Sequence, residues 1–144
     1  MDQIKIFSPA SVANVSCGFD VLGFCLDKIG DEMQVKMTDK PGIEIGEIKG
    51  QKLPKDPLKN VASIAVQSML DDYPFKNGFK IDIDKKIKPG SGIGSSAASS
   101  AGAVFAVNEL LGKPFSKKEF EIMYSLASKG IQKIIEIQKS AVNE

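Results

Sequence analysis

The chain has 144 residues, of which 42% are hydrophobic and 26% are charged, and its 19 basic and 18 acidic residues leave a net charge of +1. This composition is typical of a soluble globular protein, and the length suits one domain with a hydrophobic core better than two. Because the charges of both signs are interleaved, the sequence indicates neither a nucleic-acid-binding nor a membrane-binding protein.

The chain contains no histidine and two cysteines, Cys17 and Cys25. Without imidazole it has no histidine general base and no serine–histidine triad, and most kinds of zinc site are excluded. The cysteine spacing fits neither a metal-ligand pair nor a redox motif, so we expect both thiols to be reduced and largely buried. Together with the lack of a signal-peptide pattern and of a long apolar run, this predicts a cytoplasmic protein.

The first half of the chain is expected to form strands. Residues 4–7 alternate and predict a first strand, residues 32–37 alternate more regularly and predict a second, and residues 43–45 predict a third. Residues 46–56, which contain several lysines and Pro54, predict a mobile loop.

Helices and one further strand are expected in the second half. A helical period predicts a helix over residues 61–72, and alternation over residues 79–84 predicts the clearest strand of the chain. A second helix is expected over residues 95–111, and Ser116 with Glu119 forms a capping box for a third. We therefore expect an α+β fold, with a mixed, largely antiparallel sheet and helices packed on one face.

A glycine-rich segment joins the last strand to the helix over residues 95–111. Gly90, Gly92 and Gly94 can take positive φ and let the backbone approach a ligand closely. The first amides of the following helix have no partner within the helix, and the helix dipole makes that end partly positive. Ser95 and Ser96 add hydroxyl groups. These features predict a phosphate-binding site.

Three other interpretations of the segment fit its residues less well. The P-loop of the large NTPase class requires a lysine after the last glycine, where this chain has Ser95. The dinucleotide fingerprint requires a third glycine at the same position and an apolar parallel strand before the loop. A plain turn before a tightly packed helix would need neither the two serines nor three alternating glycines.

The segment resembles the nucleotide-phosphate motif of the GHMP kinases, the superfamily of galactokinase, homoserine kinase and mevalonate kinase. A second segment, residues 8–23, carries Pro-Ala, Ala-Asn and Gly-Phe-Asp in the order that resembles the first motif of homoserine kinases. The resemblance implies a GHMP kinase N-terminal domain that transfers the γ-phosphoryl group of MgATP to the hydroxyl of L-homoserine, in threonine biosynthesis. The residues that it implies for the ATP phosphates are Pro89, Gly90, Ser91, Gly92, Ile93, Gly94, Ser95 and Ser96.

The resemblance also implies roles for residues outside the loop. Asn14 and Asp20 would bind the substrate, since a carboxylate can pair with an ammonium group and an amide can donate or accept. From the residues alone, both could equally serve turns around Gly18. Asn60 and Val61 would contact adenine, although Asn60 is as well suited to cap a helix. Ser96 would bind Mg²⁺, and no catalytic base is assigned.

The chain departs from the family pattern near its end. Family members are longer and continue into a second domain, so residues 1–144 would form the N-terminal domain alone, with an atypical tail over residues 128–144. Ile131 stands where the resemblance implies a glutamate that helps to hold Mg²⁺. A non-catalytic nucleotide-binding remnant, or another GHMP small-molecule kinase, are therefore alternatives. A homodimer, formed through surface that the absent domain leaves bare, is one assembly open to such a remnant.

Overall fold

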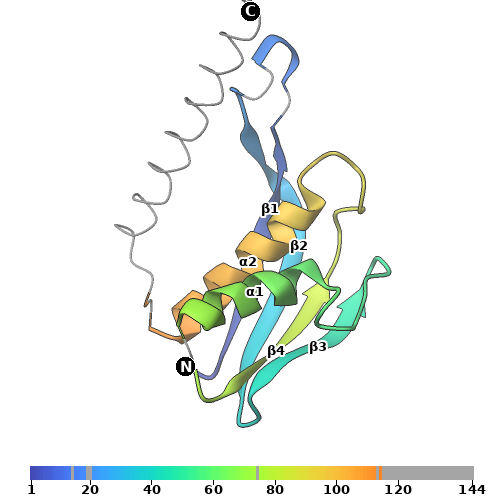
Figure 1. The fold of residues 1–144 in the computed structure, drawn as a ribbon. Coiled ribbons are helices and arrows are strands. Elements are labelled where there is room, and N and C mark those ends of the chain that lie inside the picture. Colours follow the sequence, from blue (N-terminus) through green and yellow to red (C-terminus); the bar gives the residue numbers. More distant parts are fainter. Residues whose placement is uncertain (14, 19–20, 74, 113, 115–144) are drawn as a thin grey trace, which may run out of the picture. The chain divides into compact units, whose positions relative to one another are not determined.

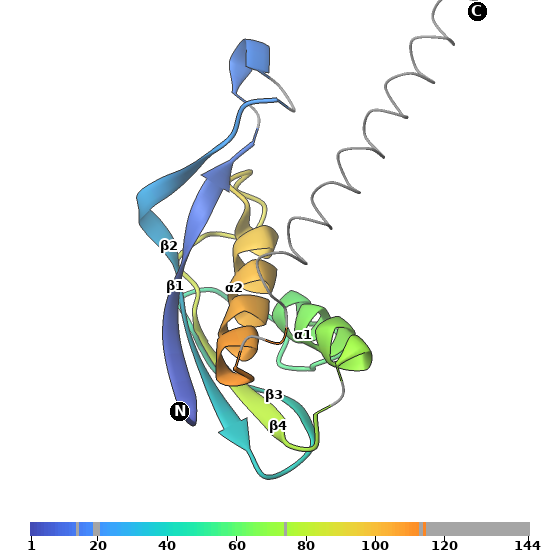
Figure 2. The ribbon, with the colours of Figure 1, turned by 90° about the vertical axis from the view of Figure 1, so that its left-hand side faces the viewer.

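The computed structural model describes residues 1–13, 15–18, 21–73, 75–112 and 114. Residues Met1–Gly112 form one compact unit. Two helices lie on the same face of a four-stranded sheet in this unit (Figures 1 and 2). In chain order the elements are β1 (Gln3–Val12), the short 3₁₀ helix η1 (Ser16–Gly18), β2 (Phe24–Thr38), β3 (Gly42–Lys49), α1 (Val61–Asp72), β4 (Gly78–Asp84) and α2 (Ser95–Leu110).

The sheet has the strand order β1-β2-β4-β3. β1 pairs with β2 and β2 pairs with β4 in antiparallel fashion, whereas β3 and β4 are parallel. The parallel pair is joined through α1, since a crossover needs a longer connection than a hairpin does. The predicted fold class, α+β with a mixed and largely antiparallel sheet, is confirmed. The third predicted helix, from Ser116, lies outside the described residues.

The prediction of a mobile loop over residues 46–56 is wrong in its first part. β3 continues to Lys49, and its register with β4 shifts between Ile45 and Ile48. Such a bulge inserts a residue and breaks the alternation from which a strand is recognised in the sequence. The connection to α1 therefore begins at Gly50, which has a φ of 81°.

The core lies between the sheet and the two helices. β2 contributes Met33 and Val35, and β4 contributes Phe79, Ile81 and Ile83, all of them at most 2% exposed. α2 faces this layer with small residues such as Ala98, Gly102 and Ala106. Because a Cβ at Gly102 would lie 2.8 Å from Cδ1 of Ile6, the helix packs very close to the sheet.

β1 and β2 extend past the helices at one end of the sheet (Figures 1 and 2). Cys25 lies in this part of β2 and Cys17 lies in η1. Both cysteines are free, as predicted, but both are exposed, so the prediction of buried thiols is wrong. Neither α1 nor α2, the two α-helices that the structure describes, covers the start of β2, where Cys25 lies. In the described part of the chain, no helix has both the length and the apolar character needed to cross a membrane.

Candidate functional site

The loop between β4 and α2 contains three glycines in the left-handed region. Gly90, Gly92 and Gly94 have φ values of 76°, 77° and 71°. A residue with a side chain would be strained by about 1–2 kcal/mol at each of these positions. Ser91 and Ile93, between them, do not have positive φ. Alternation of this kind forms the concave arrangements of backbone amides that bind anions.

Helix α2 begins at Ser95, as predicted, immediately after Gly94. Its first intrahelical hydrogen bond runs from the Ala98 amide to the Gly94 carbonyl, at 2.8 Å. The amides of residues 95–97 therefore precede the hydrogen-bond ladder of the helix. Gly94, as the N-cap residue, supplies no side-chain acceptor for them. The amides and the helix dipole together suit this end of α2 to a phosphate group.

The two serines of the first turn differ in their surroundings. Ser95 is buried, and its hydroxyl donates to the Ile87 carbonyl at 3.2 Å. Ser96 is exposed in the same turn, where its hydroxyl can reach a ligand. Sequence reasoning gave both hydroxyl groups to the phosphates, whereas in this structure the hydroxyl of Ser95 binds the protein itself.

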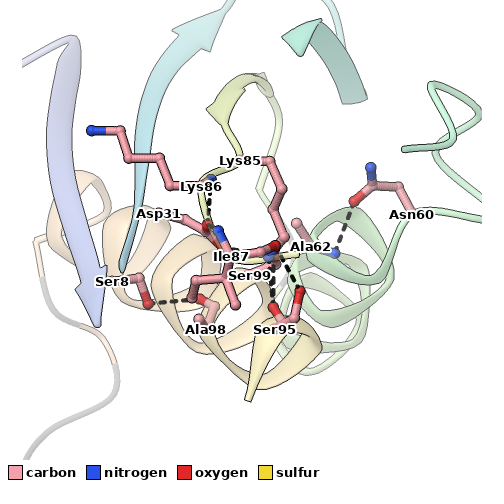
Figure 3. Close-up of polar contacts among 10 residues, drawn as sticks. All are labelled: Ser8, Asp31, Asn60, Ala62, Lys85, Lys86, Ile87, Ser95, Ala98 and Ser99. Atoms are coloured by element: carbon pink, nitrogen blue, oxygen red, sulfur yellow. Dashed lines mark hydrogen bonds and ion pairs between the residues drawn. The ribbon is translucent and has the colours of Figure 1, made fainter. Parts of the chain in front are cut away.

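A buried ion pair joins β2 to the chain after β4, close to the loop in the sequence (Figure 3). The side chains of Lys85 and Asp31 are 2% and 0% exposed, and the ammonium group of Lys85 donates to Oδ2 of Asp31. The other carboxylate oxygen, Oδ1, accepts hydrogen bonds from the amides of Lys86 and Ile87, both at 2.9 Å. Removing one partner of such a pair costs roughly 3–5 kcal/mol, because the other charge stays buried alone.

The same lysine also reaches the first turns of α2. Its Nζ lies 2.7 Å from the Ser95 carbonyl and 2.8 Å from Oγ of Ser99 (Figure 3). The network thereby connects β2, the chain after β4 and α2. Sequence reasoning missed both Lys85 and Asp31. The signal that could have found them is their position in the alternation, since Asp31 shares the parity of Met33, and Lys85 that of Ile83.

Asn60 is the N-cap residue of α1. Its Oδ1 accepts from the Ala62 amide at 3.0 Å and its Nδ2 donates to the Pro54 carbonyl at 2.8 Å. The capping interpretation of Asn60 is therefore confirmed. Val61, the next residue, is 41% exposed.

A hollow of about 90 Å³ lies between this helix start and the glycine loop. It brings the two residues predicted for adenine together with part of the predicted phosphate site. Its volume is a fraction of the 300–1,000 Å³ that is typical of ligand pockets. The residues that line it include Asn60, Val61, Lys85, Pro89, Ser95 and Ser96.

The predicted substrate residues, Asn14 and Asp20, lie outside the described residues. Ser11, at the end of β1, packs against the loop at Gly94, where an added Cβ would overlap the serine hydroxyl. The first sequence motif therefore passes along the glycine loop three residues before Asn14.

Ser96, the predicted Mg²⁺ ligand, has an exposed hydroxyl beside the candidate phosphate site. Mg²⁺ takes six oxygen ligands, of which water and phosphate commonly supply several. Among the residues that the structure describes, no group of three or more acidic, histidine or cysteine side chains is arranged to hold a metal ion.

Residues 59–136, more than half of the chain, match the family model described as the GHMP kinases N terminal domain. Homoserine kinase from Xylella fastidiosa is 41% identical over 131 residues, and the one from Chloroherpeton thalassium is 45% identical over 131 residues. The matches cover 90% and 83% of this chain but only 40% and 41% of those proteins. The chain thus spans about two fifths of the length of these relatives.

The chain is also similar to solved structures of kinases. The crystal structure of homoserine kinase from Cytophaga hutchinsonii matches with a TM-score of 0.77 and 48% identity, covering 83% of this chain and 38% of that one. The mevalonate kinase of Methanococcus jannaschii matches with a TM-score of 0.60 and 23% identity, covering 90% of this chain and 47% of that one. The second likeness, at this identity, shows a shared fold alone.

Proposed function

Because this chain belongs to the GHMP kinase family, we propose that it is the N-terminal, nucleotide-binding part of a homoserine kinase. The reaction would transfer the γ-phosphoryl group of ATP to the side-chain hydroxyl of L-homoserine and give O-phospho-L-homoserine, a step of threonine biosynthesis. The observation that carries the proposal is the hollow that Asn60 and Val61 share with Pro89, Ser95 and Ser96. Two separate stretches of sequence, assigned to the base and the phosphates of one nucleotide, line it together.

The glycine loop would hold the phosphates of ATP through its backbone. The left-handed glycines and the amides of residues 95–97 offer donors for phosphate oxygens, and the start of α2 favours negative charge. The phosphate contacts are assigned to residues 89–96, with the Ser95 contribution coming from its amide rather than its hydroxyl. Asn60 would contribute to the base site mainly by shaping it, since its side chain already holds the start of α1 and the Pro54 carbonyl.

In the proposed reaction the homoserine hydroxyl oxygen forms a bond to the γ-phosphorus while the bond from that phosphorus to the β–γ bridging oxygen breaks. ADP leaves with the electron pair of that bond, and the hydroxyl proton is released to solvent. Phosphoryl transfer depends on positioning and on charge stabilisation more than on covalent chemistry by the protein. No catalytic base is assigned, and Asn14 and Asp20 are proposed to orient the ammonium and carboxylate of the substrate.

Ser96 would supply one ligand of the Mg²⁺ ion that accompanies ATP. Such an ion, when bound, would neutralise phosphate charge during transfer. Ser96 lies in the first turn of α2, next to the amides assigned to the phosphates, which suits this role. The cytoplasmic location and the homodimer stay predictions, as does the assignment of residues 1–144 to an N-terminal domain with an atypical tail.

The proposal is tested by titrating the ¹⁵N-labelled chain with MgATP and following its amide resonances. We expect the largest shifts at Gly90, Gly92, Gly94 and Ser96, with smaller ones at Val61. Adding L-homoserine after ATP should then shift resonances between residues 11 and 23. Mevalonate and galactose, tested in the same way, distinguish another GHMP kinase. ATP-induced shifts confined to other parts of the chain would overturn the nucleotide site, and equal responses to all three substrates would overturn the homoserine assignment.

A further inference from the structure

We propose that the buried pair of Asp31 and Lys85 is a positioning device for the phosphate-binding loop. It holds the backbone of the loop in the conformation that binds a triphosphate, without contacting the nucleotide itself. The inference rests on the proposed function, because it assumes that residues 89–96 bind phosphate. It adds two positioning residues that lie outside the glycine motif.

Lys85 has no donor left for a ligand. A lysine ammonium group has three N–H donors, and the three acceptors of Lys85 are Asp31 Oδ2, the Ser95 carbonyl and Oγ of Ser99. The side chain is 2% exposed, although it contributes to the wall of the hollow beside Ser96. A direct contact with phosphate would break one of these bonds, so its role is to orient the chain around it.

The network fixes both ends of the loop. At the first end, Oδ1 of Asp31 accepts the amides of Lys86 and Ile87 (Figure 3). At the second end, Nζ of Lys85 binds the Ser95 carbonyl in the first turn of α2. The Ser95 hydroxyl closes the ring by donating to the Ile87 carbonyl. Residues 88–94, which include the three left-handed glycines, lie between these two fixed ends.

Burying Lys85 at this place adds little to the stability of the fold, which indicates a role other than stabilisation. A cation near the N-terminus of a helix lies in the unfavourable end of the helix dipole, and a buried ion pair seldom adds net stability over apolar residues of similar size. Asp31 neutralises Lys85 at this position, which leaves the outward-facing amides as the attractive feature for an anion. An arrangement that served stability alone could use apolar side chains here.

The test compares variants of the full 144-residue chain by ¹⁵N NMR titration with three probes: tripolyphosphate, adenosine and ATP. Lys85→Met removes the cation with little change in side-chain size. The double variant Asp31→Asn/Lys85→Met removes both charges but keeps an Oδ1 acceptor for the two amides. Lys86→Met is the matched control, because it is the next residue and its exposed side chain binds Glu32 instead of the loop.

We expect both Lys85 variants to bind tripolyphosphate and ATP at least about tenfold more weakly, because several charge-assisted amide contacts depend on loop geometry. Adenosine binding should change less than about twofold, and Lys86→Met should leave all three dissociation constants within about twofold of the original. The free variants should also show shifted Gly90, Gly92 and Gly94 amide resonances, with the dispersion of the other resonances kept.

Three results would overturn the inference. The first is a folded Lys85 variant that binds tripolyphosphate as the original chain does. The second is equal weakening of tripolyphosphate and adenosine, which a general loss of structure would cause. The third is unfolding of both the single and the double variant, which would assign the pair to stability. Absence of ATP and tripolyphosphate binding by the original chain would instead overturn the proposed function, and this inference with it.

Discussion

The backbone amide of Ser11 donates a hydrogen bond to the carbonyl of Ile93, with 3.1 Å between nitrogen and oxygen. The contact joins the end of β1 to the middle of the glycine loop, and thus the first sequence motif to the second. It also brings the Ser11 side chain against Gly94, where an added Cβ would overlap the serine Oγ.

We therefore predict that Gly94→Ala is strongly destabilising. Its Cβ would overlap Oγ of Ser11 and lie 3.3 Å from the Ser11 carbonyl oxygen, and its φ of 71° strains any residue with a side chain. The free energy of unfolding should fall by more than about 2 kcal/mol. Gly90→Ala is the matched control, since it has a similar φ but open space around the added Cβ, and should cost about 1 kcal/mol. Equal losses in urea denaturation would show that the contact with Ser11 contributes nothing.

The capping bond of Asn60 gives a second prediction. Asn60→Ala removes the acceptor for the Ala62 amide and the donor to the Pro54 carbonyl, so the chain should lose about 1–2 kcal/mol of stability. Asn60→Asp keeps the acceptor and should recover about half of that loss. Thermal and urea unfolding of the two variants provide the measurement. A neutral alanine variant would contradict the capping role.

A third prediction concerns acid stability and the outer face of the sheet. Hydrogen bonds from Lys5, at 2.6 Å, and from Lys86 lower the pKa of Glu32 from its ordinary value of 4.5 to about 2, and their charges act in the same direction. A carboxyl group with a lower pKa in the folded state stabilises the fold above its unfolded pKa, and that contribution is lost as the pH falls through the folded pKa.

The free energy of unfolding should therefore fall between about pH 4.5 and pH 2, and Glu32→Gln should fall less steeply over the same range. At pH 6 the original chain should be the more stable of the two, and the two should converge near pH 2. Urea denaturation at low ionic strength measures both, because salt screens exposed pairs. Parallel pH profiles of the two proteins would rule out a contribution from Glu32.

A fourth prediction concerns turnover. The 144-residue chain spans about two fifths of the homoserine kinases that it matches. Ile131, which the sequence resemblance places where a metal-binding glutamate is expected, lies outside the described residues. We expect the chain alone to bind ATP weakly and to show negligible homoserine-dependent release of ADP in a coupled assay with Mg²⁺. Turnover near about 1 s⁻¹, the low end of ordinary kinase rates, would refute this.

Much of this fold could be predicted because its strands alternate and its helices have clear ends. The bounds of α1 agree with the prediction, and α2 starts at the predicted Ser95. The strand bounds were less predictable: β1 was expected over residues 4–7 and β2 over residues 32–37, whereas they run over Gln3–Val12 and Phe24–Thr38. β3 was also predicted too short, because the bulge between Ile45 and Ile48 hides the alternation. Local sequence patterns carry no information about which residues a bulge will leave unpaired.

The site was predictable only where a motif is continuous in the sequence. Residues 89–97 form such a motif, whereas Asp31 and Lys85 are 54 positions apart and meet only because β2 and β4 are neighbours. Alternation does place Asp31 on the inward face of β2, and it places Lys85, the residue after the end of β4, on the same side as Ile83. A buried charge needs a partner of opposite sign. Two inward-facing residues of opposite charge can therefore be predicted to pair, but only once the strand order is known.

The small side chains on the buried face of α2 link core positions to the candidate phosphate site. Ala98, Gly102 and Ala106 set how closely the helix approaches the sheet, and the amides proposed to bind phosphate belong to that same helix. A larger residue at any of the three would move the helix axis, and its first turn would move with it away from Ser11 and Asp31. If the proposed phosphate site is correct, residues that contact no ligand would then be constrained by ligand binding, and substitutions by larger residues at these three positions should be rare among homologues.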